Sequence, residues 1–138
     1  MLNTVLIDAG PLIALFDKDD NYHKKIIEFI RDKRFRFITT TAVITEVSHM
    51  LDFSVQAQTM FFEWIQNEGV ILKEIQQKDL SRIIELINKY SDRPMDFADA
   101  TLVITAEKIG IKEIISIDSD FDIYRLLGKE MITNIFQR

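Results

Sequence analysis

The chain has 138 residues, of which 47% are hydrophobic and 28% charged, a composition typical of one globular domain with its own core. The lack of cysteine excludes disulfides and thiolate metal sites, and two histidines argue against a histidine-rich zinc site. Any metal would be held mainly by oxygen, which favours Mg²⁺ or Mn²⁺, while the net charge of −5 argues mildly against a phosphate-binding surface.

The N-terminal residues MLNTVLID contain no basic segment and no long apolar stretch, so they do not indicate a signal peptide. No uninterrupted apolar run approaches the roughly 18 residues of a membrane span. We therefore expect a cytoplasmic protein that does not contact a membrane.

The predicted elements alternate along the chain. A β-branched run predicts a strand at 4–7, and Gly10 and Pro11 separate it from a short helix at 12–16. The pattern then indicates a helix at 22–31, a strand at 35–39, helices at 42–52 and 59–66, a strand at 70–72 and a helix at 80–87. A helix opened by Pro94 is expected to run to about 109, followed by a strand at 113–117 and a weak strand at 131–133.

This alternation predicts a single α/β domain over residues 1–138, with a mostly parallel sheet of about five strands covered by helices on both faces. In such sheets, ligands bind beyond the carboxyl ends of the strands. The side chains that follow the strands are therefore the candidates for chemistry.

Two predicted strands end in acidic residues. Asp8 follows the first strand, and Asp118 follows the fourth, with Asp120 two residues later. Parallel strands bring Asp8 and Asp118 to the same edge of the sheet. Aspartate is also common in turns and as a helix N-cap, so for either residue alone the structural role is equally well supported.

Asp96 and Asp99 are predicted to lie in the first two turns of the helix opened by Pro94, on one helix face. Asp96 fits the favourable helix dipole. Asp99 lies between two alanines and before an apolar stretch, where aspartate is a poor helix former, which favours a functional role.

Glu46 is expected on the apolar face of the helix at 42–52, because Val43 and Met50 lie three residues before and four residues after it. A capping box does not explain its position. A carboxylate on a buried face is costly unless it is paired or bound to metal.

If these carboxylates converge, two of them about 4 Å apart repel each other by roughly 4 kcal/mol at an effective dielectric constant of about 20. One or two divalent cations would remove this repulsion, activate a water and stabilise an in-line phosphoryl displacement. The residue types therefore indicate phosphodiester hydrolysis.

Four segments together resemble the PIN-domain ribonucleases: VLIDAGPL at 5–12, TEV at 45–47, PMDFADA at 94–100 and SIDSDF at 116–121. They occur in the family's order and span essentially the whole chain. The resemblance implies a three-layer α/β/α sandwich and a metal-dependent endoribonuclease.

By matching motif positions, the resemblance implies the catalytic quartet Asp8, Glu46, Asp99 and Asp118. Three of these, Asp8, Asp99 and Asp118, are expected to bind Mg²⁺ or Mn²⁺, and Glu46 to bind through water or orient the attacking water. The outer shell or a second metal would involve Asp96, Asp120 and Ser116. Whether Asp118 or Asp120 is the more important closing acid stays open.

The subgroup most similar to the chain is the VapC-type toxins of type II toxin–antitoxin pairs. This implies an RNA substrate, a homodimer and a VapB-like antitoxin whose C-terminal segment would block the pocket. Arg93, close to Asp96, is a candidate phosphate contact. The alternatives are a PIN-like nuclease of RNA processing without a toxin role, and an inactive binding module.

Two rival classes lack a required residue. A phosphotransfer enzyme of the haloacid-dehalogenase kind needs a second Asp two residues after Asp8, where this chain has Gly10. A receiver domain needs a Lys after a late strand, where the segment after Asp118 has Ser119 and Asp120.

Overall fold

A five-stranded sheet forms the centre of the molecule. The computed structural model describes residues 2–93 and 95–136. The sheet has the order β3-β2-β1-β4-β5, and every pairing between these strands is parallel. The strands are β1 (Asn3–Ile7), β2 (Phe35–Thr40), β3 (Ile71–Lys73), β4 (Glu113–Ile115) and β5 (Thr133–Asn134).

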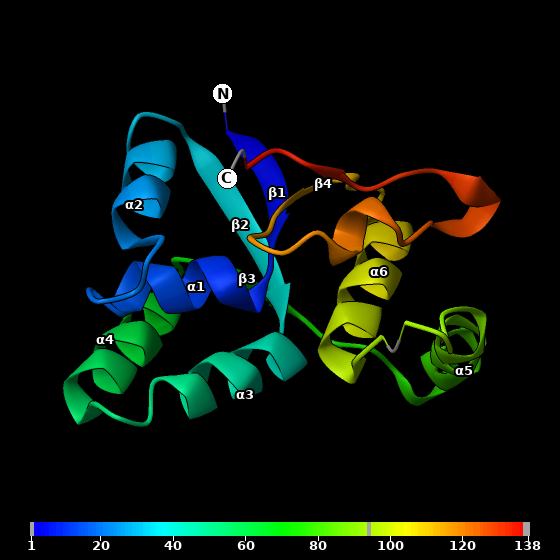
Figure 1. Cartoon of the computed structure of the whole chain (residues 1–138), viewed down its shortest axis with the longest axis horizontal. Coiled ribbons are helices and arrows are strands. Elements are labelled where there is room, and N and C mark those ends of the chain that lie inside the picture. The colour runs from blue at the N-terminus through cyan, green and yellow to red at the C-terminus, as the bar shows by residue number, and fades with distance from the viewer. Residues whose placement is uncertain (1, 94, 137–138) are drawn as a thin grey trace.

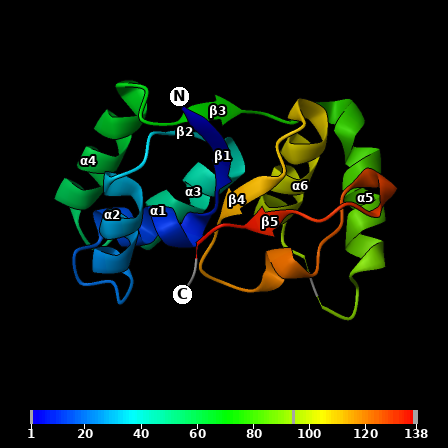
Figure 2. The ribbon, with the colours of Figure 1, turned by 90° about the horizontal axis from the view of Figure 1, so that it is seen from above.

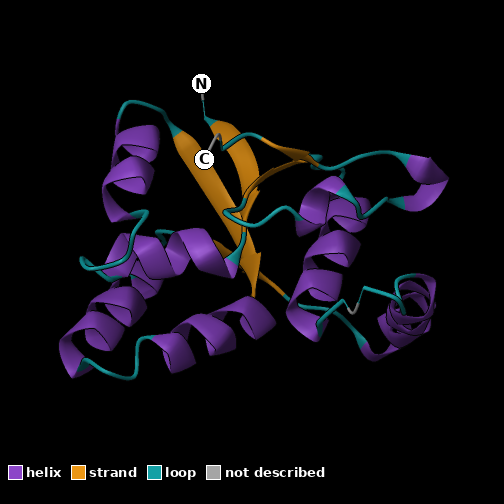
Figure 3. Cartoon of the chain, viewed as in Figure 1, coloured by secondary structure: helices purple, strands orange, loops and turns teal. Residues whose placement is uncertain are grey.

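Helices cover both sides of this sheet, as Figures 1 and 3 show. One side carries α1 (Ala9–Phe16), α2 (His23–Arg31) and α4 (Val55–Gln66), and the other carries α5 (Leu80–Lys89) and α6 (Phe97–Ile109). Figure 2 shows the same separation from above. α3 (Thr41–Met50) follows β2 and contacts both α1 and α6, so it joins the two helical layers. The predicted three-layer α/β/α sandwich is confirmed.

The core explains why α6 has no polar face. Its residues 98–106 are all buried, because the sheet packs on one side of the helix and α5 on another. Such an all-round apolar helix belongs to the interior of a domain. The acid Asp99 therefore sits on the most enclosed helix of the described residues.

Three predicted helix starts are wrong in position. α4 begins at Val55 instead of at 59, because the Ser54 side chain caps it. α1 begins at Ala9, directly after β1, instead of at 12, because Asp8 itself caps the helix. α6 begins at Phe97 with Asp96 as its N-cap, so Asp96 precedes the helix instead of lying within it. Pro94, expected to open this helix, lies outside the described residues.

The connection from α4 to β3 depends on a close approach of backbone and aromatic ring. The Gly69 amide donates to the Trp64 carbonyl at 2.8 Å, and a Cβ atom at Gly69 would overlap the Trp64 indole. Trp64 also packs against Phe16, with ring centroids 5.4 Å apart, so it has little room to move.

We expect Gly69→Ala to destabilise the protein by about 1–3 kcal/mol, because the added methyl group displaces the Trp64 ring. In a thermal melt this lowers Tm by about 3 °C or more. Gly10→Ala is the control, since its Cβ would lie 3.4 Å from Ile117, at ordinary contact distance. Equal melting temperatures for Gly69→Ala and the wild type would contradict the packing argument.

Candidate active site

Asp8 is held in place where β1 passes into α1. Its Oδ1 accepts from the Ala9 amide at 2.8 Å, and its Oδ2 accepts from the Ser116 hydroxyl at 3.0 Å. The Asp8 amide donates to the Ile115 carbonyl at 3.1 Å, which ties it to the end of β4. Asp8 is only 4% exposed and Ser116 is fully buried. The carboxylate is therefore fixed by groups from both central strands.

Asp99 enters the same region from the first turn of α6. The Asp96 side chain caps this turn by accepting from the Asp99 amide at 2.9 Å. Asp99 is 7% exposed and is flanked by the buried Ala98 and Ala100. Its Oδ2 accepts from the Tyr124 hydroxyl at 3.0 Å. This second carboxylate is thus as enclosed as Asp8 and also directed by a hydrogen bond.

Glu46 lies in the middle of α3, but the expectation that it points along a buried face is wrong. Its side chain is exposed, and Met50, which was expected beside it in the core, is 52% exposed. α3 buries Val43 and Val47 instead, so Glu46 lies at the border of the apolar face. It still belongs to the acidic group, because partial burial and the charges of Asp96 and Asp118 raise its pKa.

The segment after β4 brings Asp118 to these acids. Asp118 is exposed, and its Oδ1 accepts from the Asp120 amide at 3.0 Å. Its charge raises the pKa of Asp8, of Glu46 and of Asp99. Asp120 starts a short 3-10 turn, and its charge raises the pKa of Tyr124. The structure therefore brings the predicted acids from four distant segments into one electrostatic neighbourhood.

Burial of the two enclosed acids has a large effect on their ionisation. Desolvation, followed by smaller contributions that include the charges of Asp118 and Glu46, raises the pKa of Asp8 to about 7. Desolvation, together with the charges of Asp8 and Asp96, raises the pKa of Asp99 to about 8. The ion pairs among the described residues do not include Asp8, Glu46 or Asp99.

This donor set fits a hard divalent cation in its chemistry, because carboxylate oxygens are the ligands that Mg²⁺ and Mn²⁺ prefer. Across residues 2–93 and 95–136, however, no three or more acidic or histidine side chains stand in a ready arrangement for a metal ion. Rotation of the exposed side chains of Glu46 and Asp118 toward Asp8 and Asp99 would be needed to complete a ligand set.

Two further residues concern the surroundings of the acidic side chains: Arg93, which was predicted from the sequence, and Tyr124, which was not. Arg93 is exposed in the connection between α5 and α6, where its amide donates to the Tyr90 carbonyl at 3.0 Å. Tyr124 was not predicted as a site residue, although its hydroxyl contacts Asp99. The sequence offers no local signal for it, since the residue follows a 3-10 turn instead of a strand or helix with a regular period.

A groove of about 580 Å³ leads away from the acids between α3 and the start of α6. Its lining includes Glu46, Asp96 and the half-exposed Phe97. The carboxylates therefore border a surface that an extended ligand can reach.

Comparison with known proteins agrees with this geometry. The family model described as PIN domain matches residues 5–126. The chain belongs to the PIN-domain family. The match covers the segments that carry Asp8, Glu46, Asp99 and Asp118.

Individual PIN-domain relatives resemble the chain over most of its length. Ribonuclease VapC26 of Mycobacterium tuberculosis is 22% identical over 134 residues, covering 95% of this chain and 99% of the relative. The structure of M. tuberculosis VapC20, a Sarcin-Ricin loop cleaving toxin, has a TM-score of 0.76 and 20% identity, and covers 86% of this chain and 92% of its own. Rickettsia felis VapBC2, bound to a promoter DNA fragment, has a TM-score of 0.65 at 9% identity, covering 96% and 98%.

The raised pKa values of Asp8 and Asp99 predict how the stability of this PIN domain depends on pH when no divalent metal is present. Between about pH 4 and pH 8 the folded state binds more protons than the unfolded state, so the free energy of unfolding falls as pH rises. Asp99→Asn removes one of these ionisations. We expect the stability of the variant relative to the wild type to increase between pH 5 and pH 8, by at least the roughly 1.4 kcal/mol of one pKa unit.

Thermal melts in EDTA at several pH values measure this difference. The control is Asp52→Asn, at an exposed position in the turn after α3. A difference between Asp99→Asn and the wild type that stays constant from pH 5 to pH 8 would contradict the assigned burial of the charge.

Proposed function

We propose that this PIN domain is a metal-dependent endoribonuclease that hydrolyses RNA phosphodiester bonds, and that it acts as the toxin of a type II toxin–antitoxin pair. The observation that carries the proposal is the convergence of the buried Asp8 and Asp99 with Glu46 and Asp118 at the carboxyl ends of the parallel strands. The names of the similar proteins, a VapC ribonuclease and a VapC RNA-cleaving toxin, support the same class of activity.

In this proposal Asp8, Asp99 and Asp118 hold Mg²⁺ or Mn²⁺. When bound there, the ion would supply activation of a water and stabilisation of the charge on the phosphoryl oxygens. We assign Asp118 as the closing acid in preference to Asp120, because its charge acts on Asp8, Glu46 and Asp99. Asp120 then belongs to the outer shell.

The remaining residues position these groups. Ser116 fixes the Asp8 carboxylate by its hydrogen bond, and Asp96 fixes the first turn of α6 that carries Asp99. Glu46, which is exposed at the border of the apolar face of α3, is placed to accept a proton from a water or to orient that water. This division gives Asp8, Asp99 and Asp118 the role of metal ligands and Glu46 a role at the attacking water.

RNA would approach along the groove between α3 and α6, where Phe97 is exposed and Glu46 lies in the lining. Arg93 supplies an exposed cation three residues before Asp96 for a phosphate contact. Metal binding would offset part of the net charge of −5 at the place where phosphate must come close.

The toxin role brings further proposals: a VapB-like antitoxin, a homodimer and a cytoplasmic location, where the RNA substrate is found. The likeness to a VapBC structure supports an antitoxin partner. Within the described ranges, 2–93 and 95–136, no helix is both long enough and apolar enough to cross a membrane. Co-purification with the product of a neighbouring small gene separates the toxin from an RNA-processing nuclease of the same fold.

The enzyme proposal predicts that Asp8→Asn and Asp99→Asn each abolish cleavage of RNA while the protein remains folded. Each change removes a charge needed for the cation but keeps an oxygen that can accept the Ser116 or Tyr124 hydrogen bond. Gel-based cleavage assays with and without EDTA measure activity, and circular dichroism checks the fold. Asp52→Asn should cleave like the wild type. Wild-type rates for both site variants would refute the assignment of these two acids, whereas a wild-type protein that cleaves no RNA would indicate an inactive binding module.

Metal binding should also appear in the stability of the protein without any substrate. Mn²⁺ at about 100 times its Kd stabilises the native state by about 2.7 kcal/mol, because the ion binds the folded form in preference. We expect Tm of the wild type to rise by several degrees in Mn²⁺ or Mg²⁺, and the rise to shrink in Asp8→Asn. The same rise in wild type and Asp8→Asn would place the bound ion elsewhere.

A further inference from the structure

The hydroxyl of Tyr124 is a buried donor aimed at one oxygen of Asp99. Tyr124 has no exposed surface, and its hydroxyl lies 3.0 Å from Asp99 Oδ2. Among the described residues, Tyr124 is the one side chain that donates to the Asp99 carboxylate. None of these residues donates a hydrogen bond to Asp99 Oδ1. Asp99 is thus held through one oxygen while the other remains for a second ligand.

The phenol ring is fixed by its aromatic neighbours. The Phe121 ring meets it edge-on, with centroids 5.2 Å apart and planes at 85°, and the Tyr90 ring meets it at 5.2 Å and 65°. Phe121 is fully buried and Tyr90 is 7% exposed. The ring therefore has little freedom to follow Asp99 if the aspartate side chain rotates.

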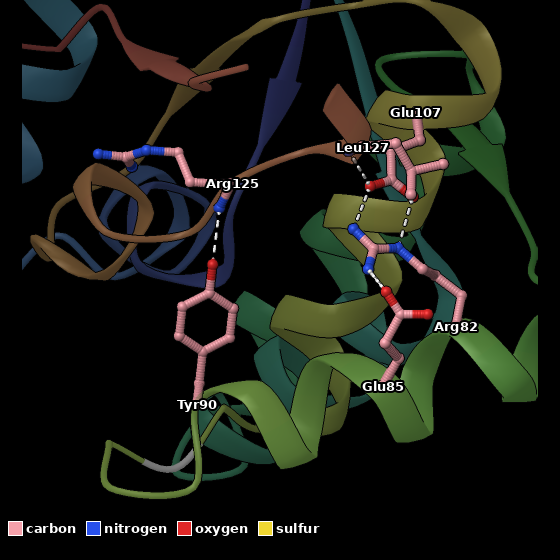
Figure 4. A network of polar contacts seen from close by, with 6 residues as sticks. All are labelled: Arg82, Glu85, Tyr90, Glu107, Arg125 and Leu127. Atoms are coloured by element: carbon pink, nitrogen blue, oxygen red, sulfur yellow. Dashed lines mark hydrogen bonds and ion pairs between the residues drawn. The ribbon is translucent and has the colours of Figure 1, made fainter. Parts of the chain in front are cut away.

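The backbone of Arg125 and Leu127, which follow Tyr124 in the chain, is anchored to Tyr90 at the end of α5 and to Glu107 of α6, as Figure 4 shows. The Arg125 amide donates to the Tyr90 hydroxyl at 2.9 Å, and the Leu127 amide donates to Glu107 Oε2 at 2.9 Å. Arg82 holds Glu107 through two hydrogen bonds, of 3.1 Å and 2.6 Å. The Glu107 side chain is 9% exposed, so this pair is largely shielded from water.

An anchored donor has a consequence for the acid that it contacts. A metal-ligating carboxylate whose one oxygen is hydrogen-bonded presents its other oxygen in a fixed direction, and the loss of such partners typically weakens metal binding about 10- to 100-fold. The Ser116 hydroxyl does the same for Asp8, at the same distance of 3.0 Å. The two most buried acids of the site thus each have one dedicated hydroxyl donor.

We propose that Tyr124 is a positioning residue of the active site, which holds the Asp99 carboxylate in the orientation that binds the divalent cation. Its ring is held by packing against the rings of Phe121 and Tyr90, and the chain after it is held by the Arg82–Glu107 pair of α5 and α6. This inference rests on the proposed function, because it takes Asp99 as a metal ligand. Tyr124 does not touch the substrate or the metal.

The variant Tyr124→Phe separates this role from packing. Phenylalanine keeps the ring contacts with Phe121 and Tyr90 and removes only the hydroxyl. The matched control is Tyr90→Phe, which removes a hydroxyl from the same aromatic group but leaves the bond to Asp99 intact. Each variant leaves a buried polar group without its partner, so we expect both to lower Tm by a similar amount, about 3 °C or more.

The experiment measures Mn²⁺ affinity by isothermal titration calorimetry, and RNA cleavage as a function of Mn²⁺ concentration. We expect Tyr124→Phe to bind Mn²⁺ at least about 10-fold more weakly than the wild type, and to need a correspondingly higher Mn²⁺ concentration for half-maximal cleavage. At saturating Mn²⁺ it should recover most of the wild-type rate. Tyr90→Phe should stay within about twofold of the wild type in Mn²⁺ affinity.

Two outcomes would overturn the inference. If Tyr124→Phe binds Mn²⁺ like the wild type, the hydroxyl does not position Asp99. If Tyr90→Phe weakens Mn²⁺ binding as much as Tyr124→Phe, general loosening of the segment and not the hydroxyl is responsible. A wild-type protein that binds no Mn²⁺, or an Asp99→Asn variant that still cleaves RNA, would instead refute the proposed function itself.

Discussion

The burial of Asp8 and Asp99 close to each other is the constraint on which the rest of the site depends. Each carboxylate is almost fully enclosed, and their neighbours are further carboxylates. Taking a charge out of water is costly unless hydrogen bonds or an opposite charge compensate for it. Hydrogen bonds from Ser116, Tyr124 and the Ala9 amide supply part of the compensation. Under the proposed function, a bound divalent cation would contribute the remainder, and stability would then depend on metal binding.

The strand order produces this crowding. β1 lies between β2 and β4, so the segment after β1 meets the segment after β4 at the carboxyl edge. α3 follows β2 at the same edge, and its contact with α6 brings Glu46 toward the start of the helix that carries Asp99. The strand order therefore brings together four segments that are far apart in the sequence. A change in strand order would separate the acids while leaving every local element intact.

Much of the site could be predicted from the sequence, and the exceptions have physical causes. Asp8 and Asp118 follow β-branched runs, and parallel strands are sufficient to bring such residues together. The argument for Glu46 was wrong although the residue does join the acids: α3 ends at Met50 with that side chain in solvent, so the assumed buried face does not exist there. Asp96 was placed inside a helix, but its extended backbone makes it the cap. The hydrophobic periodicity predicts well that an element is present, but it does not predict the residue at which a helix begins.

Tyr124 could not be predicted in this way, because its place depends on irregular structure. It lies between two 3-10 turns, η2 (Asp120–Asp122) and η3 (Leu127–Lys129), and its hydrogen-bond partner is 25 residues earlier in the chain. The segment is fixed by Glu107 of α6 and by Tyr90 just beyond the end of α5, neither of which is adjacent to the acids in sequence. The segment that carries Tyr124, the donor to Asp99, is therefore tied to the Arg82–Glu107 ion pair between α5 and α6, which lies outside the acidic group. Arg82 of α5, which holds Glu107, thus belongs to the structural support of the site.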